Sequence, residues 1–249
     1  MKFAVLLLLA LFLTGRSVDE NLNMMDKYGK EIIPIATKTT HGSAFPVRIG
    51  SSNVTVSSAH VCVNPYVSKT GKKYIRATYN NNKYALGIVK VFKSADICFL
   101  QPIKGIKPFK LDLRPKKYDR VFALGYPLRR FATELFSFDG VFKYHTINEV
   151  INANPEIVEK CSSLGPSHYV DKRQIQGMFG PMVTNVCVRK EKAIVTTARG
   201  AGGISGGPTL NKQGEVIGIN MLTTSRQNLL VLVPSSEIVR YWKNRKRLK

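Results

Sequence analysis

The feature that most constrains the fold is a succession of short runs of strand-forming residues, separated by turn signals, from about Ile32 onward. Four of these runs are Ala44–Arg48, Asn53–Ser57, Lys73–Tyr79 and Tyr84–Phe92. The asparagines at 80–82, between the last two runs, predict a hairpin turn, because asparagine tolerates the backbone conformation of tight turns. Many short strands at close spacing favour a sandwich or barrel over alternating strands and helices. We therefore expect an all-β protein.

A proline- and lysine-rich stretch at residues 102–118 separates two groups of strands. It contains prolines at 102, 108 and 115, and we interpret it as a linker between two domains. The second group of strands begins at Asp119 and ends at Pro234. A chain of 249 residues suits one compact unit or two small barrels that share a cleft.

The periodicity changes at residues 235–249, where the sequence predicts a basic C-terminal helix. Ser235 or Ser236 would cap the free backbone amides, and Glu237 would favour the positive end of the helix dipole. The apolar side chains expected on one face are Ile238, Tyr241 and Trp242. We interpret the cationic tail as a solvated helix end, with docking on an anionic partner as the alternative.

The chain has a formal net charge of +22, from 38 Lys and Arg against 16 Asp and Glu. Such a surface attracts nucleic acid, anionic membranes or acidic proteins, so an anionic partner is possible. However, the sequence lacks zinc-ligand spacing, aromatic RNA-binding strands and heptad repeats. Because charge bears on association and not on fold, nucleic-acid binding is not our main interpretation.

The N-terminus has the pattern of a signal peptide at residues 1–17. Lys2 is followed by the apolar run Phe3–Leu13, which is too short to span a bilayer because spanning takes about 20 apolar residues. The small residues Gly15 and Ser17 fit cleavage after Ser17. We expect a secreted or periplasmic protein without a transmembrane helix in the mature chain; an uncleaved N-terminal membrane anchor is the alternative.

Four cysteines, at 62, 98, 161 and 187, fit an exported protein with disulfides. Four cysteines allow three connectivities. We favour a bond between Cys161 and Cys187, because they bracket a loop-rich segment. Four reduced, buried thiols are the alternative.

The most informative string is Arg199–Leu210, in which five glycines surround Ser205. Glycine lets the backbone approach a substrate closely and direct several amides at one point. Acyl transfer needs that arrangement, because preorganised amides stabilise the oxyanion of the tetrahedral intermediate. A glycine-rich turn without chemistry would have the same composition, so other residues must decide.

Two further residues favour the chemical interpretation. His60 ends the apolar strand Val54–Ala59, and a serine hydroxyl needs such a base to act as a nucleophile. Asp96 immediately precedes the apolar run Ile97–Leu100, which places a carboxylate at a barrel rim, where it can hold the imidazole tautomer. Taken singly, a histidine is more often structural and an aspartate before a strand is usually a turn residue. Together with Ser205 they form a triad in the order His, Asp, Ser.

These three strings resemble the trypsin-like serine proteases, especially the compact bacterial and viral branch. Ser-Ser-Ala-His-Val-Cys is similar to the histidine segment of that family, Ala-Asp-Ile-Cys-Phe-Leu to its aspartate segment and Gly-Ile-Ser-Gly-Gly-Pro to its serine segment. The strings that begin at His41 and Asp119 resemble the openings of the two barrels. The resemblance covers roughly Thr39 to Trp242.

The resemblance implies two six-stranded antiparallel β-barrels of chymotrypsin-like type, with a C-terminal α-helix and an active site between the barrels. The implied domains are an N-terminal extension at 18–38, a first barrel at 39–101 and a second barrel at 119–234. A serine endopeptidase that forms an acyl-enzyme on polypeptide substrates is the implied function, with no metal or organic cofactor.

The resemblance also implies roles for individual residues. His60 would take the proton of Ser205 and return it to the leaving amine, and Asp96 would orient the imidazole. The amides of Gly203 and Ser205 would form the oxyanion hole. The strand through Asn220, Met221 and Leu222 would bind substrate by pairing with its backbone.

Two positions refine this picture. Ile204 stands where digestive family members carry an aspartate that binds a newly cut N-terminal amine, so activation by N-terminal insertion is not supported. Arg199 lies where family members place a residue at the base of the specificity pocket, and we hypothesise that it favours an acidic or polar side chain. A solvent-exposed Arg199 is the alternative.

The sequence is also compatible with two other classes of function. One is a catalytically idle binding module on a protease scaffold, against which the presence of all three triad residues argues. The other is a cationic protein associated with nucleic acid or an envelope. Labelling by a serine-directed phosphonate distinguishes the enzyme from both.

Overall fold

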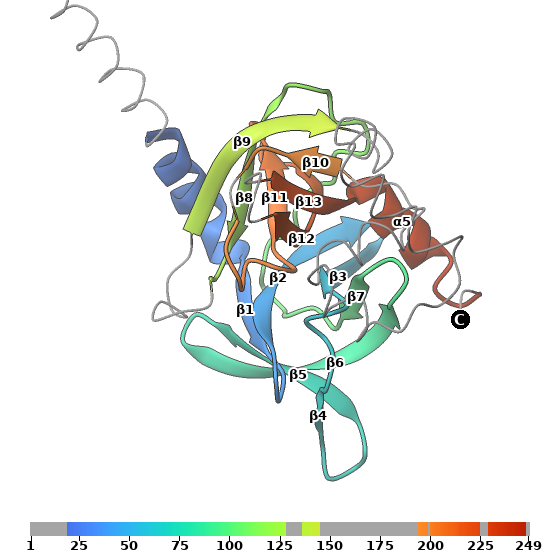
Figure 1. Cartoon of the computed structure of the whole chain (residues 1–249). Helices are drawn as coiled ribbons and strands as arrows, with labels where there is room; N and C mark the ends of the chain where they lie inside the picture. Colours follow the sequence, from blue (N-terminus) through green and yellow to red (C-terminus); the bar gives the residue numbers. More distant parts are fainter. Residues whose placement is uncertain (1–18, 128–135, 145–193, 199, 225–228, 248–249) are drawn as a thin grey trace, which may run out of the picture.

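The computed structural model describes residues 19–127, 136–144, 194–198, 200–224 and 229–247, which form two antiparallel β-sheets and helices at both ends (Figure 1). The chain builds the first sheet, passes through a linker, and then builds the second (Figure 1). The predicted all-β class, with two chymotrypsin-like antiparallel barrels and a C-terminal helix, is confirmed.

The first sheet has seven strands in the order β1-β2-β3-β7-β6-β5-β4. Its strands are β1 (Ile33–Ala36), β2 (His41–Ile49), β3 (Ser52–Ser58), β4 (Tyr66–Val67), β5 (Lys73–Tyr79), β6 (Asn82–Phe92) and β7 (Ile97–Leu100). The sheet curls on itself, because β1 also pairs with β5 through Ile35 opposite Ala77 and Ala36 opposite Arg76. Six strands thus follow one another around a ring, and the short β4 extends β5.

The hairpin between β5 and β6 confirms the turn predicted from the asparagines. Tyr79 pairs with Asn82, so the loop contains only Asn80 and Asn81. Both have positive φ, 47° and 61°. This is the backbone that a two-residue hairpin turn requires and that asparagine tolerates.

The second sheet closes into a barrel in the order β10-β13-β12-β11-β8-β9. Its strands are β8 (Arg120–Gly125), β9 (Phe136–Tyr144), β10 (Ile194–Thr196), β11 (Pro208–Asn211), β12 (Val216–Thr224) and β13 (Leu229–Pro234). Closure pairs every strand on both sides, so the barrel leaves no open sheet edge.

A shared core fixes the two barrels against each other. The largest buried apolar cluster contains Phe45 and Phe99 from the first barrel and Phe122 and Ile219 from the second. Trp242 of the C-terminal helix joins the same cluster and packs edge-on against Phe99, with 5.1 Å between ring centroids. Burial of these side chains stabilises the orientation of one barrel against the other.

The linker at 102–118 runs along both barrels. Phe109 forms a parallel bridge with Val47 of β2, and Leu111 forms one with Val216 of β12. The linker therefore contributes backbone hydrogen bonds to each barrel.

The C-terminal helix α5 (Ser235–Lys243) begins where the sequence predicts, but its cap differs. Pro234 is the N-cap residue, and no side chain caps the helix. The hydroxyl of Ser235 instead donates to the carbonyl oxygen of Val216 in β12. The predicted serine cap is therefore wrong at Ser235, because the barrel supplies a competing acceptor.

The segment 18–38, predicted as an extension outside the barrels, contributes to both of them. Residues 19–28 are helical, and the Asn21 amide group donates to Asp139 of β9 at 3.1 Å. Farther on, β1 is a strand of the first sheet, so the predicted first-barrel boundary at residue 39 is too late. No helix among the described residues is long and apolar enough to cross a membrane.

Candidate active site

His60 lies on the turn that follows β3, where the first barrel meets the second. Ser58, the last residue of β3, donates its hydroxyl to the backbone oxygen of Asn220 in β12 at 3.0 Å. This contact holds the turn against the second barrel. The His60 side chain is 48% exposed, so its ring is accessible at the surface of the site.

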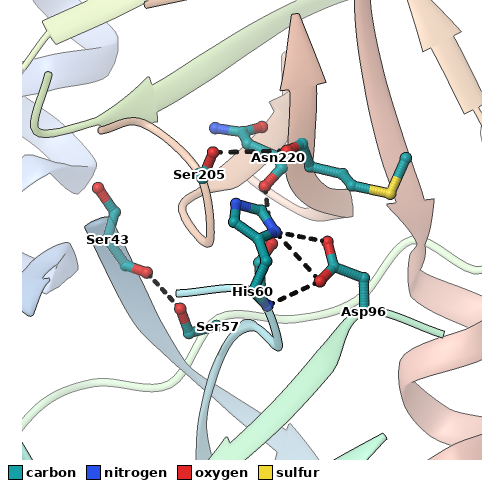
Figure 2. Close-up of polar contacts among 8 residues, drawn as sticks. Ser43, Ser57, His60, Asp96, Ser205 and Asn220 are labelled. Carbon is teal, nitrogen blue, oxygen red and sulfur yellow. Dashed lines mark hydrogen bonds and ion pairs between the residues drawn. The ribbon is translucent and has the colours of Figure 1, made fainter. Parts of the chain in front are cut away.

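Asp96 lies on the turn before β7 and faces His60 (Figure 2). Its Oδ2 and Oδ1 are 2.9 and 3.1 Å from Nδ1 of His60, and Oδ1 also accepts the His60 backbone amide at 2.9 Å. Because a carboxylate only accepts hydrogen bonds, Nδ1 must donate. The proton on Nδ1 leaves the lone pair on Nε2 of the neutral ring, which suits a general base.

The backbone of Asp96 is held in an uncommon conformation. Its φ is +56°, in the left-handed region that few residues other than glycine adopt. The Ala59 amide donates to the Asp96 carbonyl at 3.0 Å, which ties this turn to the His60 turn. The Asp96 side chain is only 4% exposed, so water screens its carboxylate weakly.

A disulfide joins the two turns that carry His60 and Asp96. Cys62 and Cys98 each lie two residues beyond one of them, and their sulfur atoms are bonded. Both cysteines are buried. The alternative of four reduced thiols is therefore wrong for this pair, while the favoured Cys161–Cys187 bond lies outside the described residues.

Ser205 lies on the loop before β11, in the second barrel. Gly206 must be glycine here: its φ is +85°, and a Cβ would lie 2.2 Å from the carbonyl oxygen of Ser43. Ser43, in β2, also donates its amide to the Ser205 carbonyl at 2.8 Å. The serine loop of the second barrel is thus packed directly on the first barrel.

The hydroxyl of Ser205 has one hydrogen-bond partner within the described residues, the carbonyl oxygen of Met221 at 3.4 Å. No hydrogen bond joins it to His60 in that part of the chain. In the view of Figure 2 the His60 ring lies between Ser205 and Asp96. The structure therefore brings the three predicted residues to one site, with the pair His60–Asp96 formed and Ser205 turned toward β12.

The backbone amides of Gly203 and Ser205 lie on the same loop and make no hydrogen bond within the described residues. Gly203 has a φ of +101°, which favours glycine. Its carbonyl oxygen accepts the hydroxyl of Ser43 at 3.1 Å. Amides without a partner in the described part of the chain, next to a hydroxyl, are the kind of donor that could bind an oxyanion.

The residues predicted to bind substrate have different outcomes. The Asn220 side chain is fully buried, so only its backbone could pair with a substrate, and that pairing stays a prediction. Met221 is nearly buried and offers its carbonyl oxygen to Ser205. Leu222 pairs with Val231 in the barrel. Arg199 lies outside the described residues.

Sequence reasoning missed two features of this site. One is the Cys62–Cys98 bond. It could have been expected because each cysteine follows His60 or Asp96 by the same number of residues. The other is the buried hydrogen-bonding role of Asn220, for which a polar residue in the apolar run from Val216 was the signal. No group of three or more His, Cys, Asp or Glu side chains that could hold a metal ion occurs among the described residues.

Comparison with known proteins agrees with this geometry. A family model described as a trypsin-like peptidase domain matches residues 42–219, more than half of the chain. The chain therefore belongs to the trypsin-like peptidase family. No curated protein matches it significantly in sequence.

Solved structures share its fold at low sequence identity. The inactive form of the Rv3671c protease of M. tuberculosis matches with a TM-score of 0.62 and 15% identity, covering 89% of this chain and 92% of that one. A serine endoprotease from Yersinia pestis matches with a TM-score of 0.60 and 13% identity, covering 89% and 64%. The HtrA-type protease AlgW, solved with a tripeptide, matches with a TM-score of 0.60 and 15% identity, covering 90% and 62%.

Proposed function

We propose that this chain is a serine endopeptidase that hydrolyses polypeptides through an acyl-enzyme, with Ser205 as nucleophile, His60 as general base and Asp96 as its orienting carboxylate. Membership of the trypsin-like peptidase family supports peptide-bond hydrolysis. The observation that carries the serine mechanism is the contact of His60 Nδ1 with the buried Asp96 carboxylate at 2.9 Å, at the site where Ser205 lies.

The first half-reaction follows from this arrangement. Ser205 Oγ bonds to the carbonyl carbon of the substrate while its proton passes to Nε2 of His60. The substrate oxygen becomes an oxyanion, which the amides of Gly203 and Ser205 are placed to bind. The carbon–nitrogen bond then breaks, the amine leaves with the proton from His60, and the acyl group stays on Ser205.

The second half-reaction repeats these steps with water. His60 removes a proton from water, the hydroxide attacks the acyl carbon, and the proton returns to Ser205 Oγ as the acid leaves. Because Asp96 is nearly enclosed, its negative charge stabilises the imidazolium more strongly than an exposed carboxylate would. Both half-reactions require Ser205 Oγ to turn from the Met221 carbonyl toward His60.

Covalent labelling tests this mechanism. A fluorescent fluorophosphonate should label the wild-type chain, because Ser205 Oγ bonds to phosphorus as fluoride leaves. The variant Ser205→Ala should remain unlabelled while keeping the melting temperature of the wild type. Labelling of Ser205→Ala, or no labelling of a folded wild type, would disprove the proposed nucleophile.

The disulfide supports the further proposal that the chain functions outside a reducing compartment. Structural disulfides persist mainly in secreted and periplasmic proteins. Residues 1–17 would be the signal peptide, and the mature chain would begin at Val18. N-terminal sequencing of the exported protein checks this, and a chain that retains Met1 would favour the membrane-anchored alternative.

For substrate preference we keep Arg199 as a proposal. A guanidinium at the base of the pocket would favour an acidic or polar residue before the scissile bond. Matched peptides with Glu or Lys at that position test this, and equal rates or faster cleavage of the Lys peptide would reject it.

A further inference from the structure

The side-chain amide of Asn220 is fully buried beneath the Ser205 loop. Its Nδ2 donates to the carbonyl oxygen of Leu124 at 3.0 Å, and it lies 3.4 Å from those of Ile204 and Pro208. Its Oδ1 accepts the hydroxyl of Thr209 at 2.6 Å. One enclosed amide thus connects β8, β11 and the loop that carries Ser205.

The backbone of Asn220 also forms hydrogen bonds with the loop that carries Ser205. Its carbonyl oxygen accepts the Gly206 amide at 2.8 Å, and its amide donates to the Gly207 carbonyl at 2.8 Å. Main chain and side chain together therefore contact the loop on both sides of Ser205. The Ser58 hydroxyl also donates a hydrogen bond to the Asn220 carbonyl oxygen, so these contacts extend to the turn that carries His60.

The contact with Ile204 bears on the orientation of the Ser205 amide. The carbonyl oxygen of Ile204 accepts the Gly207 amide at 2.9 Å and lies toward Asn220 Nδ2. In a trans peptide the C=O and the following N–H point in opposite directions. With the Ile204 oxygen turned toward Asn220 Nδ2, the Ser205 N–H points away from Asn220.

We infer that Asn220 is a positioning residue for the oxyanion hole: its buried amide sets the orientation of the Ile204–Ser205 peptide, so that the Ser205 N–H faces the developing oxyanion. This inference rests on the proposed serine-peptidase function and adds a residue to it. Asn220 touches no reacting atom; it acts through the peptide that it holds. The motif of the serine segment alone does not contain this residue.

The test uses the rate and the endpoint of labelling by a fluorescent fluorophosphonate. The phosphoryl oxygen of the probe takes up negative charge during attack by Ser205 and needs the same amides. In the full chain, Asn220→Leu should label about 10- to 100-fold more slowly than the wild type and reach the same final fraction. A variant that only folds poorly would instead reach a lower final labelled fraction, while its folded molecules would label at the wild-type rate.

Asn220→Asp provides a second variant of nearly the same shape. It keeps an oxygen for Thr209 but replaces the donor that faces Ile204, so its labelling should also be slow. If Asn220→Leu does not fold, this variant decides the question. Labelling of Asn220→Asp at the wild-type rate would overturn the inference.

Thr209→Val is the matched control, because it removes a buried hydrogen bond to Asn220 on the side of the amide that faces away from Ile204. It should lose stability by an amount similar to Asn220→Leu and still label within about threefold of the wild-type rate. Equal slowing of both variants would show that general packing, not the Ile204–Ser205 peptide, controls the rate. If the wild type itself is unlabelled, the proposed function fails first, and the inference fails with it.

Discussion

The two barrels contribute to the site in different ways. In the first barrel, His60 and Asp96 are already hydrogen-bonded, and a disulfide closes the two turns that carry them. In the second barrel, Ser205 lies on a loop held by hydrogen bonds and by the buried side chain of Ile204, and its hydroxyl faces Met221 instead of His60. The His60–Asp96 pair is therefore formed in this structure, whereas under the proposed mechanism Ser205 would have to rotate its side chain toward His60.

This difference separates two physical requirements. Orienting an imidazole by a buried carboxylate needs a rigid pair, which a covalent bond and three hydrogen bonds supply. Presenting a serine and two amides to a substrate needs an accessible backbone, which only a glycine-rich loop allows. Catalytic hydrogen bonds in free enzymes often form fully only with substrate, and the proposed mechanism expects the same of Ser205.

The largest expected effect comes from removing one residue of each barrel. Ser205→Ala, His60→Ala and the double variant should each lose about 10⁴- to 10⁶-fold in kcat/KM on a fluorogenic unfolded protein such as casein. The losses should not multiply, because the two side chains act as one unit. A double variant with the product of the two single losses would show that the barrels act independently.

Removing the orienting carboxylate should cost somewhat less. Asp96→Asn should lower kcat by about 10⁴-fold, because an amide can donate to Nδ1 and place the imidazole in the wrong tautomer. The exposed Asp119→Asn, which removes the same charge at the start of the second barrel, should stay within twofold of the wild type. Steady-state kinetics on the same substrate measure both, and a twofold effect at Asp96 would contradict the pairing.

The disulfide should affect stability more than chemistry. Cys62→Ala/Cys98→Ala opens a loop with a sequence separation of 36 and should lower the free energy of unfolding by about 3–4 kcal/mol. Denaturant unfolding followed by tryptophan fluorescence measures this. Because the three hydrogen bonds to Asp96 remain, activity should fall by less than tenfold; complete inactivity of a folded double variant would mean that the covalent bond itself assembles the pair.

The smallest effect concerns Glu31, in the turn η1 (Gly29–Glu31) that leads into β1. Burial raises the pKa of its carboxyl above the usual value, and Oε2 has no hydrogen-bond partner among the described residues. A raised pKa means that the folded chain holds the proton more tightly, so this contribution to stability is lost as pH rises from the ordinary glutamate pKa through the raised pKa of the folded chain.

Glu31→Gln should therefore stabilise the chain at pH 7 by up to about 1 kcal/mol, and the difference should vanish near pH 4. Thermal unfolding of both proteins across this pH range measures the effect. Activity should be unchanged, since η1 contributes no group to the site described above. A variant less stable at pH 7 than the wild type would show that the glutamate is ionised and paired.

The sequence by itself determined the strand content and the hairpin at Asn80 and Asn81, and it singled out His60, Asp96 and Ser205 as candidate site residues. These features are local: each depends on a few neighbouring residues whose propensity or motif is visible in the chain. The start of the first barrel was less clear, because β1 is short and is recognised as a strand only through its pairing with β2 and β5.

Only the tertiary structure decided which partner each polar group takes. Ser205 faces Met221, Ser235 bonds to Val216 instead of capping its helix, and the Asn220 amide contacts the loop that carries Ser205. Each of these choices depends on which acceptors the packed barrels bring near, and such neighbours are distant in sequence. A polar side chain buried on folding must find a partner there, so packing and not local sequence selects it.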